Sequence, residues 1–104
     1  MAENVLRARL KALEKEYQVR AQAIERDLSR THAQSFSEQA TERQNDMVLQ
    51  GLLVDAREGI KEVQLALERL DEGTYGECEQ CAEPINTARL EAMPTARLCI
   101  KCAD

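Results

Sequence analysis

Four cysteines near the end of the chain have the residue type and the spacing of a metal site. They form two C-x2-C pairs separated by 17 residues: Cys78, Cys81, Cys99 and Cys102. A tight turn within each pair can direct two thiolates at one ion, and the segment between the pairs is long enough to complete a tetrahedron. Because all four ligands would be cysteines, no coordination position stays free for water or a substrate. The spacing therefore predicts one structural zinc ion and no catalytic metal.

Two other uses of paired cysteines fit the sequence less well. Two disulfides would suit a secreted mini-protein, but the first residues, MAENVLRARLKALEKEY, contain no apolar segment of the kind that signal peptides carry. A thioredoxin-like redox site would need one C-x-x-C in a βαβ unit, and no such unit is readable here. No apolar run approaches the length of a membrane span. We therefore expect a cytoplasmic protein that makes no contact with a membrane.

The composition divides the chain near Asp71. One Phe, two Tyr and no Trp among 104 residues leave little aromatic mass for a compact core, yet 43% of the residues are hydrophobic, which argues against disorder. All the cysteines and both prolines follow Asp71. We predict two parts, a helical part at 1–72 and a zinc-organised part at 73–104.

Apolar residues in the first part recur at steps of three and four, as in a coiled coil. One series predicts a helix from about Asn4 to Arg30 and a second series follows it: Leu6, Leu10, Leu13, Tyr17, Ala21, Ile24 and Leu28, then Leu49, Leu53, Ala56, Ile60, Val63, Leu67 and Leu70. The two series pair in opposite directions with a constant register, which is what an antiparallel hairpin requires. The predicted fold is mainly α, a long antiparallel coiled-coil hairpin followed by a small four-cysteine zinc finger. The hairpin tip is expected near residue 38, in the polar stretch 32–41.

The segment from Gly73 has too few apolar residues to fold alone. Its main ones are Tyr75, Ile85, Leu90, Met93, Leu98 and Ile100. Zinc binding contributes on the order of 10–16 kcal/mol in small zinc peptides and would supply the missing stability. We expect chelation to unfold this segment before the hairpin.

The stretch GTYGECEQCAEPINTARLEAMPTARLCIKCAD resembles the zinc finger of the DksA/TraR family. That family's pattern runs G-x-Y/F-G-x-C-x-x-C-G-x-x-I, then R-L-x-A-x-P, then C-x-x-C. The residues that match it are Tyr75, Gly76, Cys78, Cys81, Ile85, Arg89, Leu90, Ala92, Pro94, Cys99 and Cys102. The resemblance implies a coiled coil that enters the secondary channel of bacterial RNA polymerase and brings its tip near the catalytic centre. It therefore implies a transcription regulator that reads no promoter sequence.

The chain departs from the family pattern in three ways. The tip motif D-x-x-D-x-A falls on Ser35, Glu38 and Ala40, which makes these the candidate partner-binding residues, with one carboxylate kept on a longer side chain and one lost. Ala82 replaces the glycine after the second cysteine, and this substitution costs energy if the turn needs a positive φ. Because the chain ends at Asp104, we expect the C-terminal helix of longer members to be missing.

Other functions were compared with this one. A net charge of −5 and the lack of a basic, aromatic-rich face argue against direct nucleic-acid binding. The sequence shows no nucleophile and base pair, cofactor loop or open metal position, so we expect no enzyme. The single histidine, His32, is interpreted as a solvated loop residue, and Arg89 and Arg97 either contact a partner or brace the finger.

An adaptor remains as the alternative function. In it, zinc stabilises a protein whose coiled-coil flank binds another protein or its own copy, and the sequence leaves monomer and weak dimer open. Leu52 is expected to widen the core, whereas four other off-seam residues are expected to face outward: Val5, Val19, Val48 and Leu65. Gly51 and Gly59 indicate either a bend in the second helix or a close helix approach.

Overall fold

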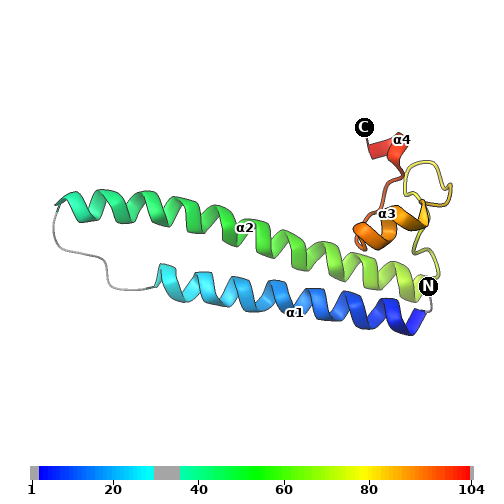
Figure 1. Ribbon diagram of the computed structural model, residues 1–104, viewed down its shortest axis with the longest axis horizontal. Helices are drawn as coiled ribbons and strands as arrows, with labels where there is room; N and C mark the ends of the chain where they lie inside the picture. Colours follow the sequence, from blue (N-terminus) through cyan, green and yellow to red (C-terminus); the bar gives the residue numbers. More distant parts are fainter. Residues whose placement is uncertain (1–2, 30–35, 104) are drawn as a thin grey trace. The chain divides into compact units, whose positions relative to one another are not determined.

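The protein is mainly helical, with two long helices followed by two short ones. The computed structural model describes residues 3–29 and 36–103, with side chains for 3–29 and 43–103. Helix α1 spans Glu3–Leu28, α2 spans Phe36–Glu72, α3 spans Thr87–Ala92 and α4 spans Ile100–Ala103 (Figure 1). The chain divides into two compact units, a finger unit of residues 1–14 and 61–104 and a hairpin unit of residues 15–60. Helices α1 and α2 each contribute to both units.

The hairpin unit is held together by the predicted seam. Its core contains Ala21, Ile24, Leu53 and Ala56, with Leu28 and Leu49 packed against them. These are residues that the antiparallel register paired, so the register is confirmed here. At the edge of the seam, Arg57 Nη2 lies 2.9 Å from Glu25 Oε1. All fourteen seam residues named above are buried or half-buried.

The two glycines of α2 have different surroundings. A Cβ built at Gly59 would lie 2.8 Å from ring carbons of Tyr17, so this glycine makes room for the aromatic ring between the helices. Of the two interpretations that the sequence left open, the close helix approach holds at Gly59. A Cβ built at Gly51 would meet nothing within 4 Å. Nothing among the residues that the structure describes explains that second glycine.

Four of the five off-seam apolar residues lie where the sequence predicted them, and one does not. Val5, Val19, Val48 and Leu65 are exposed, as expected. Leu52 was expected to widen the core, but its exposed fraction is 48%, so this prediction is wrong. Leu52 lies one position before the seam residue Leu53, and one position turns a side chain by about 100° around the helix axis, away from the seam.

The finger unit buries the apolar residues of α1 and α2 that lie within it. Leu6, Leu10, Val63 and Ala66 are buried there, with Leu10 and Val63 fully so. Arg7 Nη1 of α1 lies 2.7 Å from Asp71 Oδ1 of α2. The guanidinium of Arg9 donates a hydrogen bond to the carbonyl oxygen of Glu91 in α3. The ion pair joins α1 to the end of α2, and the hydrogen bond joins α1 to the zinc-organised segment.

Helix α2 begins earlier than its apolar seam. Its first residue is Phe36, thirteen residues before Leu49, so residues 36–41 of the expected polar tip are helical. His32 and Ser35 lie outside the described residues. Over the described residues, no helix is both long and apolar enough to cross a membrane.

Candidate metal centre

The first cysteine pair lies in a tight turn closed by backbone hydrogen bonds. The amide of Cys78 donates to the Glu83 carbonyl at 2.9 Å, and the amide of Ala82 donates back to the Cys78 carbonyl at 2.9 Å. Ala82 has φ of 63°, which is the left-handed conformation that favours glycine. The sequence departure at this position therefore has the conformational cost that was anticipated. Gly76, with φ of 87°, begins the turn, and its carbonyl accepts a hydrogen bond from Ile85 at 2.7 Å.

The second pair is formed by the start of a helix. Cys99 directly precedes α4, and Cys102 lies within it. The Cys99 carbonyl accepts hydrogen bonds from the amides of Cys102 at 3.1 Å and Ala103 at 2.9 Å. One helical turn thus brings the Cys102 side chain to the same side as Cys99.

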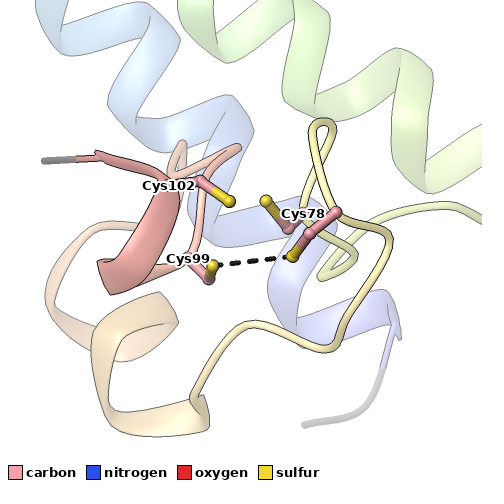
Figure 2. Close-up of side chains that lie close together, drawn as sticks. Cys78, Cys99 and Cys102 are labelled. Atoms are coloured by element: carbon pink, nitrogen blue, oxygen red, sulfur yellow. Dashed lines mark hydrogen bonds between the residues drawn. The ribbon is translucent and has the colours of Figure 1, made fainter.

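The two turns bring all four thiol groups together. The four Sγ atoms lie within 4.8 Å of one another, and the Sγ atoms of Cys81 and Cys99 are 3.7 Å apart. Figure 2 shows the side chains of Cys78, Cys99 and Cys102 converging on one point, with the 3.7 Å contact as a dashed line. A tetrahedron of sulfurs 2.3 Å from a zinc ion has edges of about 3.8 Å. The cluster therefore fits the predicted zinc ion, and it is too widely spaced for disulfides, which need about 2.05 Å.

The thiols of the cluster differ in acidity. Hydrogen bonds from backbone amides, that of Cys99 first, lower the pKa of Cys78 to about 6. A hydrogen bond with the Cys99 thiol is the largest of the contributions that raise the pKa of Cys102 to about 12. The polypeptide alone thus favours a thiolate at Cys78 and resists one at Cys102. A bound zinc ion would supply the positive charge that keeps all four groups ionised.

Arginine side chains brace the two cysteine turns. Arg89 Nε donates to the Leu98 carbonyl at 3.1 Å, which ties α3 to the residue before Cys99. Arg97 Nη1 lies 3.7 Å from Glu79 Oε2, and the Glu79 amide donates to the Arg97 carbonyl at 2.9 Å. The bracing interpretation of these two arginines is therefore supported by their contacts.

Sequence reasoning missed the contact between α2 and the first cysteine turn. Arg69 Nη1 in the last turns of α2 lies 3.2 Å from Glu79 Oε1, which is within the first C-x2-C. The Arg69 side chain is only 11% exposed, and its Nη2 atom is buried without a hydrogen-bond partner. A separate hydrogen bond closes the finger segment on itself, since the Tyr75 hydroxyl donates to the buried Pro94 carbonyl at 2.7 Å. Arg69 belongs to no motif and Glu79 is a variable position within the C-x2-C, so no sequence pattern pointed to this contact.

The candidate tip residues are separate from the metal centre. Glu38 and Ala40 fall in the first turns of α2, and the structure describes their backbone but not their side chains. Ser35 lies outside the described residues. Their assignment to partner binding thus stays a prediction.

Both parts of the chain match known protein families. Residues 73–104 match the prokaryotic dksA/traR C4-type zinc finger. Residues 3–70 match the DnaK suppressor protein-like N-terminal domain. The chain belongs to the DksA/TraR family.

Individual members of the DksA/TraR family show how far the likeness extends. The RNA polymerase-binding transcription factor DksA of Caulobacter vibrioides is 44% identical over 48 residues, covering 46% of this chain and 34% of that protein. An uncharacterised protein of Aquifex aeolicus is 49% identical over 45 residues, covering 43% of this chain and 31% of that protein. The matched stretch thus spans about a third of these relatives.

A solved structure extends the likeness over nearly all of the chain. The transcription factor DksA2 from Pseudomonas aeruginosa is 31% identical, with a TM-score of 0.86, over 97% of this chain and 79% of that one. Nearly the whole chain therefore shares its backbone fold with this transcription factor.

Proposed function

We propose that this chain binds bacterial RNA polymerase and regulates transcription by placing its hairpin in the secondary channel of the enzyme. The observation that carries the proposal is the presence of both family segments, residues 3–70 and 73–104, in one chain. Relatives such as the DksA of Caulobacter vibrioides carry the name RNA polymerase-binding transcription factor. On this proposal the chain acts by binding and carries out no reaction of its own.

The contacts of the finger support a structural role for the metal centre and a regulatory role for the hairpin. An ion pair between Arg69 and Glu79 joins the finger to the end of α2. A hydrogen bond from Arg9 to the Glu91 carbonyl joins it to α1. The metal centre would therefore hold the ends of the two long helices together, leaving the other end of the hairpin as the part that acts. A net charge of −5 favours a protein partner over the phosphate backbone of a nucleic acid.

We assign the regulatory contact to the tip. Glu38 is the one carboxylate at the positions that the family motif D-x-x-D-x-A occupies, since Ser35 carries no charge. A carboxylate near the catalytic centre of a polymerase would act on the magnesium ions or on the mobile elements around them, because both respond to local negative charge. Ser35→Asp should then strengthen the effect by restoring the second charge.

The test is a transcription assay on core polymerase with a sigma factor, run beside a binding measurement. Glu38→Gln should lower the effect on transcript yield by about tenfold, the weight of one charge-assisted contact, while binding changes by less than about threefold. Lys11→Ala is the matched control, since Lys11 is an exposed charged residue on α1. It should leave both quantities unchanged.

The adaptor function makes the opposite prediction. If the chain fails to bind polymerase at micromolar concentration, the proposal is wrong and the adaptor takes its place. If it binds but both Glu38→Gln and Ser35→Asp are silent, the tip assignment is wrong while polymerase binding stands.

A further inference from the structure

An apolar patch lies on the outward face of α2 in the hairpin unit. From Met47 to Val54 the only side chain with polar atoms is Gln50. The exposed fractions are 71% for Met47, 63% for Val48, 48% for Leu52 and 52% for Val54. Singly exposed apolar residues are common, but a contiguous group on one helix marks an interaction surface.

Gly51 lies in the middle of this patch. A glycine in a helix interior destabilises the helix relative to alanine. At Gly59 the Tyr17 ring requires that glycine, whereas a Cβ at Gly51 would meet nothing within 4 Å. The missing side chain at Gly51 lets another helix approach α2 closely, and no element in the described part of the chain takes that place.

The residues along the patch are arranged so that they complement a reversed copy of themselves. Arg43, Met47, Gly51, Val54 and Glu58 follow one another at steps of three or four, so they form one stripe on the outer face of α2. Met47 and Val54 are equally far from the bond between residues 50 and 51, and so are Arg43 and Glu58. Arg43 and Glu58 are both exposed. An antiparallel copy would therefore set each arginine against a glutamate and each Met47 against a Val54.

We propose that two copies of this chain associate weakly through the stripe Arg43–Met47–Gly51–Val54–Glu58, with their α2 helices antiparallel and Gly51 next to the two-fold axis. A two-fold interface uses the same surface on both partners, which is what this arrangement offers. A parallel pairing would set like residues against each other and place arginine against arginine. The one-helix stripe is smaller than the roughly 1,200–2,000 Å² that a stable interface buries, so the dimer should be weak.

The test is sedimentation equilibrium of the full zinc-loaded chain from about 10 μM to about 1 mM, a range that brackets a dissociation constant near 0.1 mM. The wild type should pass from monomer to dimer across this range. Arg43→Glu alone and Glu58→Arg alone should each weaken association by about tenfold, because each dimer contains two such contacts and both become repulsive. The double variant Arg43→Glu/Glu58→Arg restores both opposite-charge pairs and should associate within about threefold of the wild type.

Two further variants separate the interface from the fold. Lys11→Glu makes the same charge change on α1 and should leave association unchanged. Gly51→Leu places a large side chain where the two helices meet, so it should abolish association without lowering the helical circular dichroism signal of the monomer. A monomer throughout the range, or single reversals that have no effect, or a double reversal that fails to restore the dimer, would each overturn the proposal. If the wild type stays monomeric and Gly51→Leu abolishes its binding to polymerase, the patch contacts the polymerase and the dimer proposal is wrong.

Discussion

Arg69 Nη1 lies 3.2 Å from Glu79 Oε1 and thereby joins the last turns of α2 to the first cysteine pair. The two ends of this ion pair have different surroundings. Arg69 is 11% exposed with an unpaired Nη2, whereas Glu79 is 41% exposed and also lies 3.7 Å from Arg97. The burial is therefore uneven, and the two partners should not respond alike to substitution.

Removing the carboxylate should cost more than removing the guanidinium. Glu79→Gln leaves a buried arginine without its counter-ion and should lower the free energy of unfolding by about 1–2 kcal/mol, a value reduced by the exposure of Glu79. Arg69→Met fills a similar volume, and the Glu79 carboxylate can still interact with water and with Arg97. This substitution should therefore lower the free energy of unfolding by less than about 1 kcal/mol. Urea unfolding of the zinc-loaded protein measures both. Equal costs, or a larger cost for Arg69→Met, would show that the uneven burial has no energetic consequence.

Ala82 holds a conformation that suits glycine. With φ of 63° it is strained by about 1 kcal/mol, so Ala82→Gly should raise zinc affinity by about fivefold. Competition with a chromophoric chelator measures this. Ala88→Gly in α3 is the control, because Ala88 lies in a helix and the same exchange there should destabilise the finger. Unchanged or lower zinc affinity in Ala82→Gly would show that the turn gains nothing from glycine.

The two glycines of α2 should respond oppositely to alanine. Gly51→Ala meets open space and should raise the stability of the monomer by about 1 kcal/mol. Gly59→Ala would bring a methyl group to 2.8 Å from the Tyr17 ring and should destabilise the chain by about 1 kcal/mol. Thermal unfolding at low micromolar concentration compares the two. A gain at Gly59 would mean that the ring moves aside without loss of packing.

Zinc affinity should fall as the pH falls. The metal needs four thiolates, and protons compete for each of them. The pKa of Cys78 is lowered to about 6, so its thiolate persists to lower pH than a free thiol, and its contribution is lost as the pH falls through that value. Zinc release followed with a chelating dye should therefore steepen below about pH 6. Circular dichroism in parallel should show that the finger loses structure before the two long helices do, and simultaneous loss would contradict this order.

The predictable parts of the fold are those that leave a regular spacing of residues in the sequence. The core pairs Ala21 with Ala56 and Ile24 with Leu53 follow from apolar periodicity, because the register of an antiparallel pair is fixed once two series are known. The four cysteines follow from their spacing, since ligand geometry constrains it. The positive φ at Ala82 was anticipated from a glycine in the family pattern.

Three features could not be predicted by the same reasoning. The first turns of α2, from Phe36 onward, lack an apolar seam, so a search for periodicity placed the tip there although many of these residues favour helix. The contact between Arg69 and Glu79 joins two segments through tertiary packing, which leaves no repeating pattern in the sequence. Leu52 was misplaced because one helical position decides whether a flank residue is covered.

The most direct test of polymerase binding is a competition experiment with labelled, zinc-loaded chain and bacterial core RNA polymerase. The DksA protein of Caulobacter vibrioides serves as the competitor. We predict binding at micromolar concentration or tighter, displacement of the labelled chain by that DksA, and loss of binding after zinc is removed. Absence of binding, or simultaneous binding of both proteins to one polymerase, would contradict a shared site in the secondary channel.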